Sequence, residues 1–461
     1  MTQRVKNIHL IGIGGAGMSG IAEILINLGF NITGSDMRST EVTDRLVKLG
    51  ATIFIGHATE NVESCDVVVY SSAVKIDNVE IVAARERKLP VIKRPEMLAE
   101  LMRMKYGICI GGTHGKTTTT SMTGLVLTRG NIDPTIIVGG RVTDYGGGAK
   151  IGRSHFLVLE ADEYDRTFLM LTPVIAVVTN IDLDHLDCYR DLDDIKGAFL
   201  QFVNKVPFFG SVILCIDDAG VKSIMPGIGR RTITYGISRQ AQIRAENIDQ
   251  KGVLTTFDVA SEGGRLGTVS LPAPGFHNVR NALAAAAIGI EMGVPFETIA
   301  GALAEFEPVS RRFEKKGEAA GVAVYDDFAH HPTEIIAMLK GIRNGFPNRI
   351  IAVFQPHLYS RTRDFYEDFG RAFMDSDILV VTDIYPAREK PIEGVTGKLV
   401  ADAAVAAGHG SVLYVGNKDD LPQVIADLAS GGDMVITIGA GDIHTVGVRL
   451  LGLLSKSGKE G

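Results

Sequence analysis

The sequence predicts an α/β protein of three domains, each built on a mainly parallel sheet covered by helices. Apolar runs of strand length alternate with helical patterns along almost the whole chain, as in folds where helices connect parallel strands. Two glycine-rich turns directly follow such runs. A length of 461 residues fits about three domains. We place them at residues 1–104, 105–309 and 310–461.

The first predicted elements form a strand, a glycine turn and a helix. The apolar run 8–11 is followed by Gly-Ile-Gly-Gly-Ala-Gly at 12–17 and a helix from about Met18, and Asp36 follows a second strand over 31–34. This spacing predicts a diphosphate at a helix N-terminus and a sugar hydroxyl on the carboxylate. Either NAD or a nucleotide-sugar diphosphate such as a UDP-sugar satisfies both, and a purely structural turn is the remaining alternative.

A second glycine turn opens the central block. Gly-Gly-Thr-His-Gly-Lys-Thr-Thr at 111–118 follows the apolar run 106–110. Lys116 is placed to reach the outer phosphates of ATP, and the Thr117 hydroxyl to bind Mg²⁺. Ile110 stands where the common G-x-x-x-x-G-K-[ST] spelling has glycine, so the loop is one residue shorter. The alternative is a turn that only joins strand to helix.

Acidic residues follow the next two predicted strands. The strand over 156–159 leads into Glu160-Ala-Asp-Glu-Tyr-Asp165, and the strand over 174–179 leads into Asn180-Ile-Asp-Leu-Asp-His185-Leu-Asp187. The carboxyl ends of parallel strands share one edge of a sheet, where ligands bind. Oxygen ligands gathered at that edge predict a Mg²⁺ site.

The rest of the chain continues the alternation. Strand-like segments over 232–236, 242–247, 253–259 and 267–271 predict an antiparallel edge of the central sheet. The segment 277–282 opens an alanine-rich helix, where Asn278 and Arg280 are either functional or only a cap and a solvated charge. In the last block, strands are expected at 322–325, 350–354, 378–382, 412–415 and 434–438.

Histidines and arginines gather after two strands of this last block, at 326–334 and 355–363. Zinc is not expected, because neighbouring side chains at a strand end point apart and no cysteine or HExxH pattern completes a ligand set. Binding of phosphate or carboxylate groups suits these residues better.

Charge and composition exclude several classes of partner. Acidic residues outnumber basic ones by 54 to 47, and no long basic run occurs, so we expect neither nucleic acid nor a membrane surface as partner. The sequence has no spanning apolar stretch and no signal-peptide pattern, which predicts a cytoplasmic protein. The four scattered cysteines are expected to be reduced thiols.

Ten motifs in order resemble the Mur ligases, the ATP-dependent amide-forming enzymes of peptidoglycan precursor synthesis. They are GIGGAGMSG, YSSAV, GTHGKTTT, EADEYD, TNIDLDHLD, HNVRNALAA, SRRFE, YDDFAHHPTEI, FQPHLYSRTRDF and DIYPAREKPIEGVTG. The resemblance covers essentially the whole chain. It implies a Rossmann-like N-terminal domain that binds UDP-N-acetylmuramate rather than NAD, a P-loop ATPase-type central domain with a small antiparallel edge, and a Rossmann-like C-terminal domain that closes on ATP.

The resemblance also implies a role for individual residues. For the UDP-sugar they are Gly12, Gly14, Gly15, Ala16, Gly17, Asp36, Ser71, Ser72, Ala73, Arg94 and His114. For ATP they are Gly111, Gly112, Thr113, His114, Gly115, Lys116, Thr117, Thr118, Asn281, Arg312, Asp326 and His330. Two Mg²⁺ ions are expected on Thr117, Glu160 and His185, catalysis on Lys116, Glu160 and His185, and the amino acid near His330, His357 and Arg361.

The implied reaction joins L-alanine to UDP-N-acetylmuramate through an acyl phosphate. The protein is expected to be a monomer or a homodimer. A ligase that attaches a ready-made murein peptide to the same sugar nucleotide is the nearest alternative. An NAD-dependent oxidoreductase or a non-catalytic nucleotide-binding protein would leave the Gly-Lys-Thr loop or the strand-end acids without a role.

Two departures from the family pattern concern particular positions. The stretch 198–202 contains no lysine, so the carbamylated lysine of several sister ligases is not expected. Leu358 and Phe328 stand where many alanine-adding relatives have a basic residue and an aromatic hydroxyl, which changes the side chains available to the amino acid.

Overall fold

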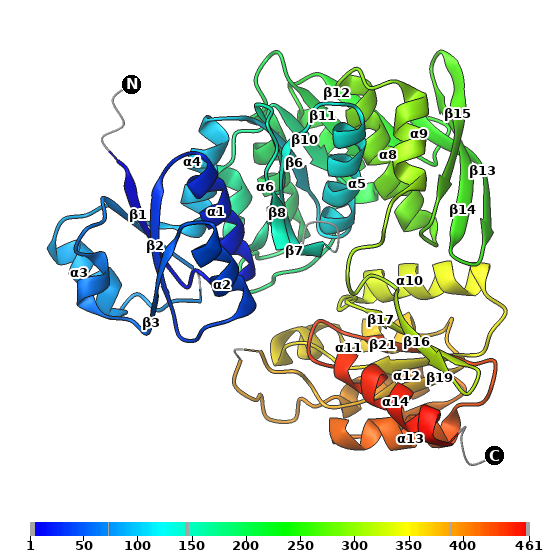
Figure 1. Cartoon of the computed structure of the whole chain (residues 1–461). Helices are drawn as coiled ribbons and strands as arrows, with labels where there is room; N and C mark the ends of the chain where they lie inside the picture. Colours follow the sequence, from blue (N-terminus) through cyan, green and yellow to red (C-terminus); the bar gives the residue numbers. More distant parts are fainter. Residues whose placement is uncertain (1–4, 72, 143–146, 388, 458–461) are drawn as a thin grey trace. The chain divides into compact units, whose positions relative to one another are not determined.

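Three sheets, each flanked by helices, make up the fold of the computed structural model, which describes residues 5–71, 73–142, 147–387 and 389–457 (Figure 1). By their internal contacts, residues 1–248, 257–270 and 280–307 form one compact unit, and residues 249–256, 271–279 and 308–461 form the other. The first two sheets lie mainly in the former unit and the third in the latter. The α/β class predicted from the sequence is confirmed.

The first sheet is entirely parallel, in the order β3-β2-β1-β4-β5. Its strands are β1 (Asn7–Ile11), β2 (Asn31–Asp36), β3 (Thr52–Ile55), β4 (Val67–Tyr70) and β5 (Val91–Lys93). The helical segments are α1 (Ala16–Asn27), α2 (Glu41–Lys48), η1 (Thr59–Val62), α3 (Val79–Glu86) and α4 (Arg94–Arg103). The strand order reverses between β1 and β4, which places the glycine turn after β1 at the switch point where such sheets bind ligands.

Helix α1 begins at Ala16, two residues before the predicted start at Met18. Gly15 has an extended backbone (φ −66°, ψ 144°), and its carbonyl already accepts the Ser19 N–H at 2.9 Å. The first turn of the helix therefore begins directly after the glycine pair.

The central sheet has ten strands, in the order β15-β14-β13-β12-β11-β10-β6-β9-β7-β8. Its strands are β6 (Tyr106–Gly111), β7 (Thr135–Val142), β8 (Gly147–Lys150), β9 (Phe156–Glu160), β10 (Ile175–Val178), β11 (Ser211–Cys215), β12 (Thr232–Gly236), β13 (Ile243–Lys251), β14 (Leu254–Ser261) and β15 (Gly264–Leu271). The helical segments are α5 (Lys116–Arg129), η3 (Tyr164–Met170), α6 (Leu192–Asn204), α7 (Ala219–Ile224), η4 (Met225–Gly227), α8 (Phe276–Glu291) and α9 (Phe296–Ala304).

The antiparallel edge of this sheet starts one strand later than predicted. Strand β12 pairs in parallel with β11 and, over two residue pairs, with β13, so including Thr232–Gly236 in the antiparallel edge was wrong. Helix α7 carries the chain from β11 back across the sheet, which allows the parallel direction. The β13–β14 and β14–β15 connections are too short for a crossover and make hairpins. A further antiparallel pair, β7 with β8, was not predicted.

The third sheet has the order β16-β17-β21-β18-β19-β20, parallel except for the edge pair β16–β17. Its strands are β16 (Glu314–Ala319), β17 (Val322–Asp327), β18 (Ile350–Phe354), β19 (Ile378–Val381), β20 (Val412–Tyr414) and β21 (Met434–Ile438). The helical segments are α10 (Pro332–Gly345), α11 (Tyr359–Ala372), α12 (Lys398–Ala406), η5 (Lys418–Asp420), α13 (Leu421–Leu428) and α14 (His444–Ser457).

Strand β17 runs two residues beyond its predicted end. Asp326 and Asp327 stay in register with Thr437 and Ile438 of β21, because both carboxylates find hydrogen-bond donors at the end of the sheet. Of the residues that the structure describes, no helix is both long and apolar enough to span a membrane.

Three phenylalanines connect the loop after β9 to the core of the central domain. Phe168 of η3 is fully buried, and its ring centroid lies 5.0 Å from those of both Phe199 and Phe202 on α6. Aromatic contacts of this kind add to the free energy gained from burial. The loop that carries the acidic residues is therefore anchored by packing as well as by hydrogen bonds.

We expect Phe168→Ala to lower the free energy of unfolding by about 3–5 kcal/mol, because it leaves a cavity between Phe199 and Phe202. Urea denaturation measures the change. Phe208→Ala is the control, since that side chain is 93% exposed, and it should change stability little. A loss for Phe168→Ala as small as that of the control would contradict the anchoring role.

Candidate functional site

The loop between β6 and α5 has a backbone that requires glycine at two positions. Gly112 and Gly115 have φ angles of +136° and +82°. A Cβ atom at Gly115 would lie 2.6 Å from Oδ1 of Asn281, and one at Gly112 would collide with Thr179. Asn281, one of the residues predicted to bind ATP, therefore lies beside this loop, on helix α8, and its contact with ATP stays a prediction.

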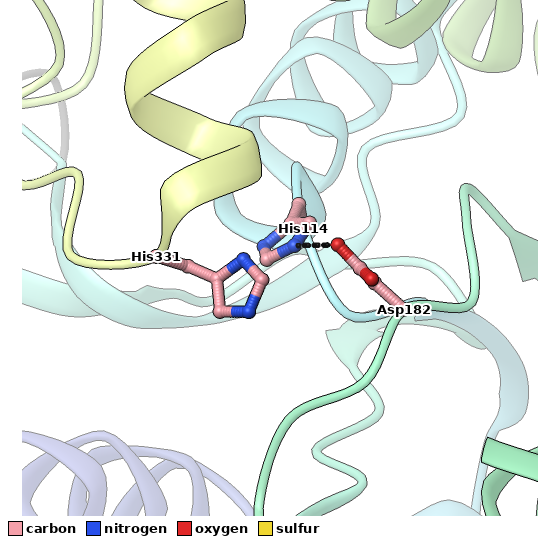
Figure 2. Close-up of side chains that lie close together, drawn as sticks. All are labelled: His114, Asp182 and His331. Carbon is pink, nitrogen blue, oxygen red and sulfur yellow. Dashed lines mark hydrogen bonds and ion pairs between the residues drawn. The ribbon is translucent and has the colours of Figure 1, made fainter. Parts of the chain in front are cut away.

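The loop is held in place by the segment that follows β10. The His114 carbonyl accepts from the Thr179 hydroxyl at 2.7 Å and from the Asn180 amide at 3.0 Å, and the His114 N–H donates to Asn180 at 2.8 Å. Figure 2 shows the His114 ring paired with the Asp182 carboxylate at 3.2 Å. These bonds set the loop conformation before any ligand binds.

Lys116, the first residue of α5, points back over the loop. Its ammonium donates to the carbonyls of Gly112 and Thr113 at 2.7 and 3.1 Å, and to both carboxylate oxygens of Glu163 at 2.7 and 3.0 Å. Burial alone would lower the pKa of Lys116, but Glu163, with further help from Asp162 and Glu160, outweighs burial and raises it. Lys116 is thus a firmly charged cation at the start of a helix.

His185 completes this cluster from the other neighbouring strand. Its Nε2 lies 3.4 Å from Oε1 of Glu163 and 3.9 Å from Oδ2 of Asp184. Burial opposes the charged imidazole, but the two carboxylates outweigh it and raise the pKa of His185. The backbone of His185 is left-handed (φ 55°), a costly conformation of the kind found at functional sites.

The predicted magnesium ligands therefore come from three adjacent strand ends. Thr117 lies on α5 after β6, Glu160 ends β9, and His185 follows β10, in a sheet where β6 lies between the other two strands. A hydroxyl, a carboxylate and an imidazole beside a loop suited to phosphates form a donor set that fits Mg²⁺ shared with a nucleotide.

The N-terminal glycine turn is packed tightly against two of its predicted partners. The Gly14 N–H donates to Oδ2 of Asp36 at 2.9 Å, and a Cβ atom at Gly17 would collide with the Arg94 guanidinium. Gly12 (φ +77°) lies against Ser71. The fold thus brings the turn, Asp36, Ser71 and Arg94 together. Ser72 lies outside the described residues. The next residue, Ala73, is described and has an exposed side chain.

A buried carboxylate network lies beside this turn and was not predicted. Glu80 is fully buried and accepts from Ser35 at 2.6 Å, His57 at 2.9 Å and Asn61 at 2.6 Å. Burial alone would raise the pKa of Glu80, but hydrogen bonds from its neighbours, His9 foremost, lower it to about 2. Because Ser35 directly precedes Asp36, the network fixes the strand end that carries Asp36.

In the C-terminal unit, Asp326 is fully buried. Its carboxylate accepts from Arg311 at 2.8 Å and from Thr437 at 2.7 Å. Arg311 also donates to the carbonyls of Gly439 and Gly441, at 2.6 and 3.0 Å. An ATP contact by Asp326 stays a prediction, whereas its role in holding the chain at the start of the C-terminal domain is direct.

Two of the residues that are predicted to bind the amino-acid substrate have neighbouring imidazole rings. The centroids of His330 and His357 are 6.0 Å apart, and His357 stacks on Tyr385 at 5.8 Å. Arg361 is buried on α11.

Arg312 lies 3.6 Å from Glu334 and over the Phe328 ring. Burial raises the pKa of Asp327 to about 6.

Three functional candidates escaped residue-level prediction from the sequence. Glu163 lies in the acidic run after β9, but nothing in the run marks it as the partner of Lys116. Arg311 directly precedes the predicted Arg312, and nothing in the sequence distinguishes the roles of these two neighbouring arginines. Glu80 carries no sequence signal, because its partners come from four separate segments of the domain.

Comparisons with known proteins agree along the chain. The family models described as Mur ligase family catalytic domain, Mur ligase middle domain, and Mur ligase glutamate ligase domain match residues 7–106, 110–289 and 311–441. A UDP-N-acetylmuramate–L-alanine ligase of Salinibacter ruber is 53% identical over 457 residues, which cover 99% of this chain and 96% of the relative.

Two solved structures are also similar over nearly the whole chain. A UDP-N-acetylmuramate–alanine ligase from Thermotoga maritima superposes with a TM-score of 0.80 at 30% identity, covering 98% of this chain and 100% of the other. A murein peptide ligase from Psychrobacter arcticus superposes with a TM-score of 0.69 at 26% identity, covering 98% of this chain and 99% of the other.

The Glu80 network predicts a specific dependence of stability on pH. A folded-state pKa below the ordinary 4.5 contributes stability that is fully present above about pH 5 and is lost as the pH falls towards 2. Melting temperatures of the unmodified protein and Glu80→Gln should differ most at neutral pH and converge in acid. Glu86→Gln, an exposed acid on the same helix, serves as control. A pH-independent difference for Glu80→Gln would show that the carboxylate's charge contributes nothing.

Proposed function

The chain belongs to the Mur ligase family, and on that premise we propose that it joins L-alanine to UDP-N-acetylmuramate while converting ATP to ADP and phosphate. The observation that carries the proposal is the phosphate loop, where Lys116 pairs with Glu163, which follows β9, and Glu163 also contacts His185, which follows β10. The proposed substrates are those named for the relative that is 53% identical over 99% of this chain. The reaction serves peptidoglycan precursor synthesis.

ATP is proposed to bind with its phosphates on the loop 111–118. The N-terminus of α5, which begins at Lys116, would offer its backbone N–H groups to that position. In the first step, the carboxylate of the sugar nucleotide attacks the γ-phosphorus, which gives an acyl phosphate and releases ADP. Lys116 stabilises the negative charge that develops on the transferred phosphoryl group. Thr117, Glu160 and His185 would hold up to two Mg²⁺ ions, which when bound supply further positive charge against the phosphate oxygens.

The sugar nucleotide is proposed to bind at the N-terminal glycine turn. The first turn of α1 offers its N–H groups to the diphosphate, and Arg94 lies against Gly17 with a positive charge for the same group. The Asp36 carboxylate accepts the Gly14 N–H and is proposed to accept a hydroxyl of the uridine or the sugar. Ser71, Ser72 and Ala73 are proposed to contact the same ligand. The bond to Gly14 keeps the carboxylate oriented before the ligand arrives.

In the second step, the neutral amine of L-alanine adds to the acyl phosphate carbonyl and expels phosphate. His330, His357 and Arg361 are proposed to receive the amino acid, and Arg361 suits its carboxylate. Arg312, Asp326 and His330 are proposed to contribute to ATP binding from the C-terminal domain.

The protein is proposed to act in the cytoplasm. ATP and nucleotide sugars are cytoplasmic metabolites, and the four free thiols are in keeping with a reducing compartment.

A murein peptide ligase is the second candidate, because a structure with that name superposes over nearly the whole chain. Both reactions begin with the same acyl phosphate and differ in the amine that attacks it. The acceptor therefore separates them.

Phosphate release from ATP in the presence of UDP-N-acetylmuramate tests the proposal. We expect release that depends on L-alanine and Mg²⁺, with a product heavier by one alanine residue, and no release after chelation of Mg²⁺ with EDTA. A murein tripeptide replaces L-alanine in a parallel reaction. Release with the tripeptide alone would assign the chain to the second candidate, and release with neither acceptor would refute the proposed function.

Lys116→Ala should lower kcat/KM for amide formation about 100-fold or more, because the transferred phosphoryl group loses its nearest cation. Lys222→Ala, an exposed lysine on α7, is the matched control and should retain full activity. Thermal melting confirms that both variants fold. Undiminished activity of folded Lys116→Ala would rule out this role for the loop.

A further inference from the structure

The ammonium of Lys116 already has an anionic partner at the phosphate loop. Both oxygens of Glu163 lie within hydrogen-bond distance of Nζ, at 2.7 and 3.0 Å. The Glu163 side chain is only 2% exposed and that of Lys116 is 16% exposed. A bidentate charged contact with so little access to water is a strong interaction. The Glu163 carboxylate therefore binds Lys116 in the way that a phosphate group would.

Glu163 also connects the two strand ends on either side of the loop. It follows β9, and its Oε1 lies 3.4 Å from Nε2 of His185, which follows β10. Because β6 and its loop lie between these strands, the carboxylate reaches across the loop to contact both Lys116 and His185. An incoming anion that pairs with Lys116 meets Glu163 as a competitor for the same N–H donors.

The position of Glu163 is set by a bend that the fold actively holds. Asp165 and Arg166 both have left-handed backbones, with φ angles of 52° and 55°. The Tyr189 hydroxyl donates to the Glu163 carbonyl at 2.7 Å, and the Arg166 guanidinium lies 4.7 Å from the Tyr189 ring centroid. Such costly backbone conformations persist only where the surroundings impose them, as they do at functional sites.

We propose that Glu163 is a positioning residue that holds Lys116 in the nucleotide-free enzyme and is displaced from it by the γ-phosphate of ATP. This inference rests on the proposed function. The pair keeps a buried lysine charged and oriented before ATP arrives, since an unpaired buried charge would be costly. In exchange, part of the attraction between Lys116 and the γ-phosphate is spent on breaking the contact with Glu163.

Competition predicts that removing the Glu163 charge strengthens binding of the triphosphate selectively. We expect Glu163→Gln to bind the ATP analogue AMPPNP with Mg²⁺ about tenfold more tightly than the unmodified protein does, because a charged hydrogen-bonded competitor is lost. The affinity for ADP should change much less, since ADP has no γ-phosphate. Calorimetric titration of both nucleotides gives the ratio of the two affinities for each protein.

Two variants sharpen the measurement. Asp193→Asn removes an acid on α6 whose side chain is 89% exposed, and its ratio of AMPPNP to ADP affinity should stay close to that of the unmodified protein. Tyr189→Phe keeps the Glu163 carboxylate but loses the hydroxyl that anchors its backbone, and it should shift the ratio in the same direction as Glu163→Gln, by less.

The sign of the change decides the proposal. If Glu163 instead supports Lys116 while the γ-phosphate is bound, Glu163→Gln will weaken AMPPNP more than ADP, and the proposal fails. Equal weakening of both nucleotides would reduce Glu163 to a structural role and would also overturn it. Failure of the unmodified protein to bind either nucleotide would refute the proposed function itself, a separate outcome. Because each ratio is measured within one variant, a moderate loss of stability does not obscure it.

Discussion

A buried positive charge at the start of helix α5 is the constraint that organises the central domain. Lys116 must remain charged for its proposed role at the phosphates of ATP, and its surroundings are largely closed to water, so carboxylates have to lie close by. Parallel strands meet this need, because the chain leaves β9 and β10 on either side of the loop at the same edge of the sheet. Glu163 and His185 reach the loop from those two sides, and the left-handed residues beside them adjust the direction in which their side chains point.

In the N-terminal domain, the group that has to be held in position is a carboxylate, that of Asp36. Asp36 must present a carboxylate beside the glycine turn, and the Gly14 N–H and the buried network around Glu80 hold its strand end in place. In the C-terminal domain, Arg311 joins the buried Asp326 to the glycine turn after β21. Each domain thus uses a buried or half-buried ionic contact at the carboxyl edge of its sheet to fix the backbone from which the proposed ligand-binding side chains extend.

Most of the fold and part of the site could be predicted from local sequence. Strands β18 and β21 have the predicted limits, because buried parallel strands are continuous apolar runs with clear ends. The pairing direction of β12 was not predictable, since it depends on the route of α7 rather than on the residues of the strand. The same limit applies to β7 and β8, whose partner is chosen by position in the sheet.

The sequence by itself determined the fold class, the two glycine turns and the gathering of acids beyond β9 and β10, because glycine conformation, apolar periodicity and strand-end position are local properties. Only the tertiary structure decided that Glu163 pairs with Lys116, that Glu80 is buried among Ser35, His57 and Asn61, and that Arg311 anchors Asp326. Several acids compete for each cation in the sequence, and the choice among them depends on backbone direction and burial, which arise only when distant segments pack together.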